Sequence, residues 1–288
     1  MVFHPGAKVS YVAPYSSHRQ ANTIGTLNIL EFSNHRRLKA LHYSSTITSY
    51  GPTGFVTGAR LLPEDERPAA HLAALPYDTG YAQSQNVAEG IIWDAIDHGF
   101  PIAIHRPGFV LGESGICNPD DFTSRLFMSC MEMGSYPSLP GQRQEFVPVV
   151  DFVVNSMLHI STKQTNLGHA YNLVHPNLDD AISTIASFEL INELSPYQMK
   201  GIPYDDWVNS MSERVDDPLH PLTPMLRERV CDQKTRWEVY EGMSEYGRAN
   251  MVQALQDAPE VLHCRPIETV FQRSLQSRMP CCGRKGGG

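Results

Sequence analysis

Residues 80–108 read GYAQSQNVAEGIIWDAIDHGFPIAIHRPG. The apolar residues of the first part recur every three or four positions, which predicts one amphipathic helix over 80–99. The apolar run that follows predicts a short strand over 101–106. A long helix that leads directly into a strand is half of a βαβ unit, so this stretch favours an α/β fold. The periodic apolar residues are Val87, Ile91, Ile92 and Ile96.

The alternation of helix and strand patterns extends along most of the chain. Such alternation is typical of a parallel sheet with helices on its faces. Residues 51–78 are rich in Gly and Pro and include the acidic run Pro63–Arg67; they are predicted to form an excursion over the site, functional or only solvated. From about residue 178 the pattern becomes helical and proline-punctuated. The other predicted helices are 17–34, 120–133 and 151–161, and the other predicted strands are 39–46, 145–150 and 169–174.

Composition and charge exclude several kinds of partner. The chain has 288 residues and a formal net charge of −8, with its Lys and Arg residues scattered, so a nucleic-acid partner is not expected. No apolar run approaches the length of a membrane span, so no membrane association is expected. The six cysteines form no C-x-x-C pair and no disulfide framework, which indicates reduced thiols and a cytoplasmic location.

Two other site chemistries are disfavoured. No metal site is expected, because the twelve histidines include no H-E-x-x-H and no pair beside Cys or Asp at ligand spacing. A serine hydrolase needs a G-x-S-x-G elbow. The nearest sequence, GESG at residues 112–115, lacks the final spacing.

Three segments present reactive groups in a particular order. A predicted strand ends at Ser-Ser-Thr46, the predicted helix begins with Tyr81, and the next strand ends at Arg-Pro-Gly108. This order resembles the active site of the extended short-chain dehydrogenases, whose helix carries Tyr-x-x-x-Lys. Positions 81 and 85 share one helix face, and here the second position is Gln85.

Further motifs narrow the resemblance to one family. Residues 2–7 resemble the H-x-A/G-A loop on the cofactor side, and residues 22–26 resemble the N-x-x-G-T helix motif. The others resemble the terminal thioester reductase domains of fungal nonribosomal peptide and polyketide synthetases, which are kin to the aminoadipate and carboxylic acid reductases. Several of them argue against a sugar epimerase or an isoflavone-type reductase. These other motifs are residues 118–122, 134–137, 146–152, 217–226 and 235–240.

The resemblance implies a reaction and roles for particular residues. NADPH would reduce an acyl thioester held on the phosphopantetheine arm of an acyl or peptidyl carrier protein, and the product would be an aldehyde or, after a second round, an alcohol. Thr46 would donate to the thioester oxygen, Tyr81 would protonate or stabilise the oxyanion, and Gln85 would reach the cofactor ribose. His105 is expected to pack rather than react. The residues expected at the cofactor are His4, Gly6, Ala7, Asn22, Tyr81, Gln85, Pro107 and Gly108.

The same resemblance implies a division into three parts. Residues 1–177 would form a partial NAD(P)-binding Rossmann-like domain, residues 178–279 a small helical substrate-binding subdomain, and residues 280–288 a disordered tail. No G-x-x-G-x-x-G follows a first strand, so the Rossmann-like sheet is expected to lack its first strands and the phosphate-binding helix N-terminus. Three explanations stay open: a fragment of a larger synthetase, which is favoured; a partner that supplies the missing half; or a redox-inactive remnant, for instance a cyclising release domain.

Position 85 carries glutamine where the short-chain dehydrogenases have lysine. The charge stabilisation that the phenol of Tyr81 loses by this difference can be calculated. An ammonium about 5 Å from the phenol oxygen, at an effective dielectric of about 20, contributes about 3 kcal/mol. That energy corresponds to about 2 units of the phenol pKa. Gln85 can donate a hydrogen bond to ribose but supplies no charge, so a slower enzyme is expected rather than an inactive one.

Overall fold

The computed structural model describes residues 1–110, 121–139, 143–144, 146–147, 150–177, 182–240, 244–264, 266, 268–273 and 275. Its centre is a four-stranded sheet in the order β1-β2-β4-β9, in which every neighbouring pair is parallel. The predicted parallel sheet is therefore confirmed, and the carboxyl ends of its strands meet at one edge. The strands are β1 (Val2–His4), β2 (Leu41–Ser44), β4 (Ile102–Pro107) and β9 (Ala170–Leu173).

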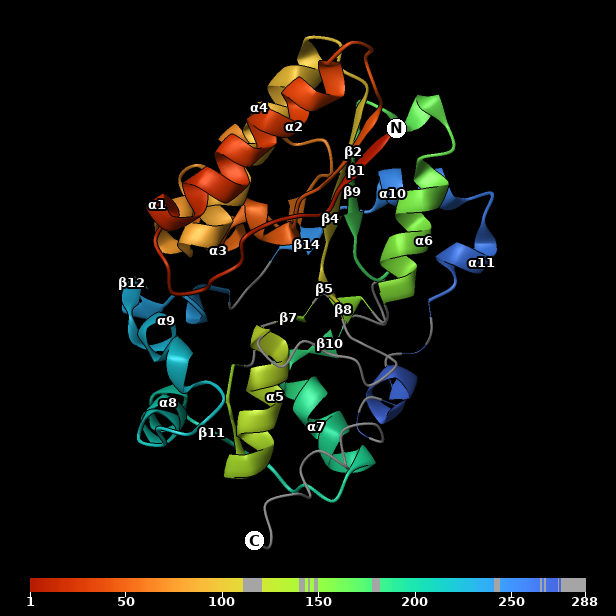
Figure 1. Ribbon diagram of the computed structural model, residues 1–288. Coiled ribbons are helices and arrows are strands. Elements are labelled where there is room, and N and C mark those ends of the chain that lie inside the picture. Colours follow the sequence, from red (N-terminus) through yellow and green to blue (C-terminus); the bar gives the residue numbers. More distant parts are fainter. Residues whose placement is uncertain are drawn as a thin grey trace, which may run out of the picture.

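Helices cover both faces of this sheet (Figure 1). Because side chains alternate along a strand, Leu41 and Ile104 pack toward α4, whereas Ala103 and Leu173 pack toward α6 and α10. One face carries α1 (Tyr15–His18), α2 (Gly25–Asn34) and α4 (Gly80–Asp97); the other carries α6 (Val150–Ile160), α10 (Ala249–Leu255) and α11 (Pro259–Leu262). In the described part of the chain, no helix combines the length and apolar composition needed to cross a membrane.

The helix predicted over 17–34 is present with an irregular centre. A π-helical turn, Arg19–Ile24, joins α1 to α2. Within it the Asn22 amide donates to the main-chain oxygen of Lys8 and to the hydroxyl of Ser84 on α4. Turns of this kind occur mostly inside α-helices and often near functional sites. Here the turn carries Asn22, whose hydrogen bonds join the helix to α4 and to the loop after β1.

The strand predicted over 145–150 is wrong as a member of the central sheet. Of the residues described in this range, those of β8 (Phe146–Val147) are extended, and they pair with β5 (Phe109–Val110) in a separate two-stranded sheet. A further short pair joins β7 (Arg143–Gln144) to β10 (Ile182–Ser183). A short apolar run shows extended structure without showing its partner, since strand pairing depends on residues far away in the sequence.

The segment 51–78, predicted to be an excursion over the site, is bound to the rest of the fold by strand pairing and by buried hydrogen bonds. It contains α3 (Thr53–Thr57) and β3 (Leu61–Leu62), and β3 pairs with β14 (Glu245–Tyr246). Glu64 is only 4% exposed. Its carboxylate accepts hydrogen bonds from the main-chain N–H groups of Asn172, Asn250 and Met251. The acidic run therefore ties the excursion to β9 and to the start of α10.

A second, mostly helical half packs below the sheet (Figure 1). Its apolar core includes Phe127, Phe188, Trp207 and Leu226. Packing crosses the predicted boundary after residue 177, because α5 and β6 contribute to this half whereas α10 returns to the sheet. The three-part division stays a prediction, and residues 280–288 lie outside the described residues. The elements of this half are α5 (Phe122–Met133), β6 (Ser135–Pro137), α7 (Thr184–Leu194), β11 (Lys200–Ile202), α8 (Tyr204–Ser212), α9 (Thr223–Arg227), β12 (Arg229–Cys231) and β13 (Lys234–Thr235).

Candidate active site

The three residues predicted to be catalytic meet at one phenol oxygen. Tyr81 lies in the first turn of α4, which Thr79 caps by accepting from the N–H of Ala82 at 3.2 Å. Gln85, one turn later, donates from its amide nitrogen to the Tyr81 hydroxyl at 3.2 Å. The hydroxyl of Thr46, just after β2, also acts on this phenol and favours its ionised form.

Local geometry directs the Thr46 hydroxyl toward Tyr81. Thr46 caps the 3-10 turn Ile47–Tyr50, and its oxygen accepts from the N–H of Thr48 at 3.3 Å and from the Thr48 hydroxyl at 3.2 Å. With both acceptor positions of this oxygen used, the Thr46 proton is free to donate to Tyr81.

The phenol of Tyr81 is held in its neutral form. Burial raises the pKa of Tyr81 above its ordinary value, and the Gln85 amide and the Thr46 hydroxyl oppose this increase without cancelling it. Rings of Tyr11 and His18 lie 6.4 Å and 6.2 Å from the Tyr81 ring, centroid to centroid. The phenol can therefore act as a proton or hydrogen-bond donor at neutral pH.

A buried ion pair holds the helix and the strands of the site together. Glu89, two turns after Tyr81, forms two hydrogen bonds with Arg106 at the end of β4, at 2.5 Å and 2.9 Å. Both side chains are 1% exposed. Burial acts against the Glu89 carboxylate, but the Arg106 guanidinium holds its pKa below the ordinary value. Ser45, next to Thr46, donates to the same carboxylate at 2.6 Å, so this pair fixes Thr46 relative to α4.

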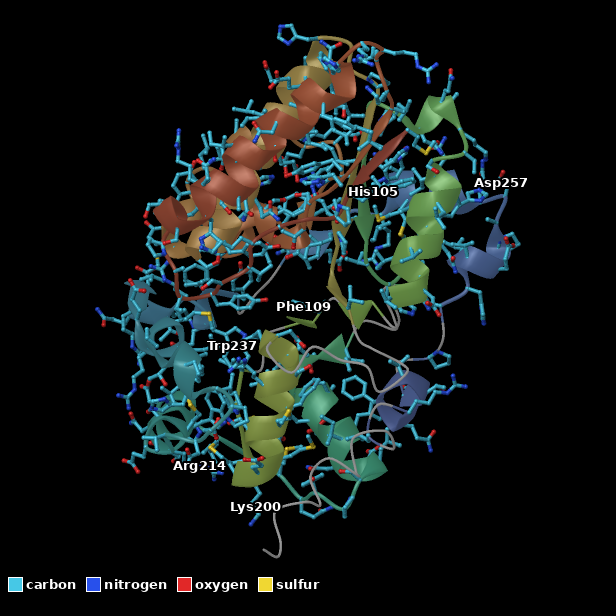
Figure 2. The ribbon with its side chains drawn as sticks, in the orientation of Figure 1. His105, Phe109, Lys200, Arg214, Trp237 and Asp257 are labelled. Atoms are coloured by element: carbon cyan, nitrogen blue, oxygen red, sulfur yellow. The ribbon has the colours of Figure 1, made fainter. Side chains whose placement is uncertain are left out.

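A pocket of about 70 Å³ lies in front of Tyr81, between the sheet half and the helical half. Figure 2 places Phe109 and Trp237 in this region. One part of the wall comes from the motifs at residues 217–226 and 235–240, which lie in the predicted substrate region. The residues are Met225, Arg236, Trp237 and Tyr240. Tyr81 lines the pocket, whereas Thr46 and Gln85 do not; the threonines in the wall are Thr48 and Thr79. The lining residues are Tyr11, Ile47, Thr48, Asp78, Thr79, Tyr81, Phe109, Phe122, Met225, Arg236, Trp237, Tyr240 and Tyr246.

The residues predicted at the cofactor lie near the carboxyl ends of β1 and β4. His4 ends β1, and Gly6 and Ala7 follow it in an exposed loop. Burial lowers the pKa of His4 below its ordinary value. At the end of β4, the N–H of Gly108 donates to the oxygen of Leu173 at 3.1 Å. That N–H is therefore occupied, and only the carbonyl oxygens of Pro107 and Gly108 remain for a cofactor amide.

The side chain of Asn22 forms hydrogen bonds within the chain. Its amide oxygen accepts from the N–H of Lys8 at 2.7 Å, and its nitrogen donates to the Lys8 oxygen and the Ser84 hydroxyl, each at 2.9 Å. The side chain thus holds the loop after Ala7 against α4.

Sequence reasoning missed Asp78 and Tyr11 in the pocket. Asp78 belongs to the excursion, where the only available signal was a carboxylate directly before the helix cap Thr79. Tyr11 follows the cofactor-side loop and reaches the pocket only because that loop folds back onto α4. A contact between residues as far apart in the sequence as Tyr11 and Tyr81 leaves no pattern in the local sequence.

Comparisons with known proteins show which proteins the chain resembles. A family model described as male sterility protein, of the NAD-binding type, matches residues 1–157. The nonribosomal peptide synthetase FrzA of Cladobotryum sp. is 47% identical over 275 residues, which are 95% of this chain and 27% of that protein. The aldehyde reductase lnaA of Aspergillus flavus is 48% identical over 265 residues, 90% of this chain and 25% of that protein. The chain spans about a quarter of the length of these relatives.

Solved structures include one with a similar fold over the whole chain. The terminal R domain from the myxalamid PKS-NRPS biosynthetic pathway has a TM-score of 0.81 and 27% sequence identity. The match covers 99% of this chain and 69% of that one.

Proposed function

The chain belongs to the male sterility protein family of NAD-binding domains, and on that premise we propose that it reduces a carrier-bound acyl thioester with NADPH. The released product is an aldehyde, or an alcohol after a second reduction, in secondary-metabolite biosynthesis. The observation that carries the proposal is the neutral phenol of Tyr81, which is held by Thr46 and Gln85 at the wall of an aromatic pocket.

The chain offers a set of residues for the cofactor. NADPH, when bound, supplies the hydride that the thioester carbonyl carbon accepts. The exposed loop of Gly6 and Ala7, the Gln85 amide and the carbonyl oxygens of Pro107 and Gly108 would hold its ribose and nicotinamide. Asn22 fixes that loop through Lys8.

Tyr81 stabilises the charge that develops on the substrate. As the carbonyl carbon becomes tetrahedral, negative charge collects on its oxygen, and a donor already oriented toward that oxygen lowers the barrier. Gln85 donates to the phenol oxygen and thereby orients it. Gln85 and Thr46 both favour the charge that the phenol takes on when it gives up its proton. The described neighbours of this oxygen are neutral, unlike the lysine of a short-chain dehydrogenase. Protonation by Tyr81 is therefore slower than it would be with a cation at position 85.

The substrate side of the pocket suits an acyl chain delivered from outside. Aromatic and apolar side chains from both halves line it, and they exclude water from the thioester. An acyl or peptidyl carrier protein is the proposed partner, because a phosphopantetheine arm can carry an acyl group from the surface to Tyr81.

Product analysis tests the proposal. The product of the complete reading frame is incubated with NADPH and an acyl-pantetheine thioester, and the acyl product is trapped as a hydrazone. The expected result is one NADPH consumed per aldehyde formed, with free pantetheine thiol in equal amount. Release of thiol with a cyclic or hydrolysed product and no NADPH consumption would favour the redox-inactive alternative, for which the neutral Gln85 is the supporting observation.

A further inference from the structure

A second hydroxyl group lies in the pocket wall close to Tyr81. Thr48 lines the same pocket as Tyr81 and stands two residues after Thr46, in the turn that follows β2. Its hydroxyl donates to the Thr46 oxygen at 3.2 Å, and Thr46 in turn acts on the Tyr81 phenol. The Thr48 and Tyr81 hydroxyls are therefore neighbours through Thr46. The mechanism proposed above gives Thr48 no part.

The turn that carries Thr48 is held rigidly against α4 and the sheet. The Asn86 amide on α4 donates to the main-chain oxygen of Ser49 at 3.0 Å. The Arg106 guanidinium at the end of β4 donates to the Tyr50 hydroxyl at 2.6 Å. Both Ser49 and Tyr50 are buried. A hydroxyl on such a turn is positioned before the substrate arrives, which is what stabilisation of a developing charge requires.

The Thr48 proton can turn from one acceptor to another. Among the described residues the Thr48 hydroxyl has one hydrogen-bond partner, the neutral oxygen of Thr46. A hydroxyl proton rotates to suit its surroundings, and hydrogen bonds to an ionised acceptor are roughly twice as strong as those between neutral groups. An oxyanion in the pocket would therefore draw this proton away from Thr46. The Thr46 oxygen would keep the hydrogen bond from the Thr48 N–H at 3.3 Å.

Two other hydroxyls in the pocket wall are engaged by a carboxyl group instead. The Tyr240 hydroxyl donates to Asp78. The Thr79 hydroxyl acts on the same carboxyl group, and its oxygen caps α4. A carboxylate holds a donor more strongly than the neutral Thr46 oxygen does. Thr48 is therefore better placed than Tyr240 or Thr79 to donate to a substrate oxygen.

We propose that Thr48 is a further catalytic residue, whose hydroxyl is the second donor, beside Tyr81, to the oxygen of the thioester carbonyl. The proposal rests on the thioester reductase function. When hydride reaches the carbonyl carbon, the electron pair of the C=O π bond moves to the oxygen; Tyr81 gives that oxygen a proton, whereas Thr48 donates a hydrogen bond and keeps its own. A neutral carbonyl competes with Thr46 for this donor on about equal terms, but the oxyanion does not. The interaction therefore forms mainly in the transition state and raises kcat rather than substrate affinity.

Initial rates of the product of the complete reading frame, with NADPH and an acyl-pantetheine thioester, test this role. Thr48→Val removes the hydroxyl and keeps the shape of the side chain, so kcat should fall at least about tenfold while KM changes by less than about twofold. Thr48→Ser retains the hydroxyl and should keep kcat within about threefold of the unaltered protein. Thr162→Val, at an exposed threonine just after α6, is the matched control and should change neither constant.

Binding of an inert analogue provides a readout that needs no turnover. In this analogue an amide replaces the thioester on acyl-pantetheine, and titration calorimetry measures its Kd. Because the analogue presents a neutral carbonyl, Thr48→Val should bind it within about twofold of the unaltered protein. If Thr48 only shaped the pocket wall, its replacement would weaken binding of the analogue together with the rate, and that result would overturn the catalytic role.

The outcomes separate this inference from the function on which it rests. Turnover by the unaltered protein with an equal kcat for Thr48→Val overturns the role of Thr48 and leaves the reductase proposal standing. A loss in Thr48→Ser as large as that in Thr48→Val does the same, because the hydroxyl then makes no difference. No turnover by the unaltered protein contradicts both proposals. Thr48→Ala removes the same hydroxyl from a smaller side chain and should lose as much of kcat as Thr48→Val, so the test does not depend on the folding of one variant.

Discussion

The amide nitrogen of Gln85 lies 3.2 Å from the phenol oxygen of Tyr81, one helical turn earlier on α4. Position 85 therefore touches the proposed proton donor directly, and its charge acts on the phenol at short range. A neutral side chain there leaves burial as the dominant influence on the pKa of Tyr81. The contact explains how the site keeps its hydrogen-bond geometry while it loses charge stabilisation.

Gln85→Lys should restore that charge. An ammonium about 5 Å from the phenol contributes about 3 kcal/mol, or about 2 pKa units. Because the neutral phenol is the donor, the alkaline pH at which the rate of thioester reduction falls to half its maximum should move down by about 2 units, measured as NADPH consumption across a pH series. Val87→Lys adds the same charge at an exposed position of α4 and should leave the profile in place. A profile unchanged by Gln85→Lys would show that ionisation of Tyr81 does not limit the reaction.

Glu89→Gln should destabilise the fold strongly. It leaves the Arg106 guanidinium buried without its carboxylate, and loss of one partner of a buried pair costs about 3–5 kcal/mol. The free energy of unfolding in urea measures the loss. Asp97→Asn, which breaks an exposed pair with Arg67, should cost under about 1 kcal/mol. Similar losses for the two variants would mean that the buried pair contributes no more than a surface pair.

His42 and His105 should make the fold sensitive to mild acid. They lie in adjacent strands with ring nitrogens 3.1 Å apart. Burial lowers the pKa of His42 to about 4 and that of His105 to about 3. Since the unfolded imidazoles titrate near 6.5, the unfolded state binds more protons below that pH. Stability is therefore fully present above pH 6.5 and is lost as the pH falls toward 4 and 3.

His42→Phe provides the measurement for that acid sensitivity. The variant removes one titrating group in a row of stacked rings that includes Phe3, so its free energy of unfolding should fall less steeply between pH 7 and pH 5. His98→Gln changes an exposed histidine and should not flatten the dependence. Parallel curves for the unaltered protein and His42→Phe would contradict the buried neutral pair.

The spacing of apolar residues predicted the helices and strands that bury one face against the rest of the protein. The spacing of Ile92 and its neighbours predicted α4, and with it the shared face of Tyr81 and Gln85, because helical geometry needs no distant partner. The order of strand, helix and strand then placed Thr46 and Tyr81 at one edge of a parallel sheet.

The remaining features depend on contacts between distant residues. Glu64 belongs to an acidic run that looks solvated, yet it accepts from the N–H of Asn250, 186 residues later. Asp78 meets Tyr240 across 162 residues. Neither burial has a local signal, since a carboxylate is tolerated inside only when the folded chain brings donors to it.

Tyr81→Phe tests the central claim most directly. The change removes the phenol hydroxyl and keeps the ring that packs beside Tyr11, so the fold should persist while the rate of NADPH-dependent aldehyde formation from an acyl-pantetheine thioester falls by about a hundredfold or more. Tyr15→Phe, on α1, is the matched control and should retain the rate. The measurement is initial rates for the three proteins at one pH, with equal far-ultraviolet circular dichroism as the check on folding. A rate for Tyr81→Phe equal to that of the unaltered protein, or no turnover by the unaltered protein at all, would contradict the assignment of Tyr81 as the proton donor of a thioester reductase.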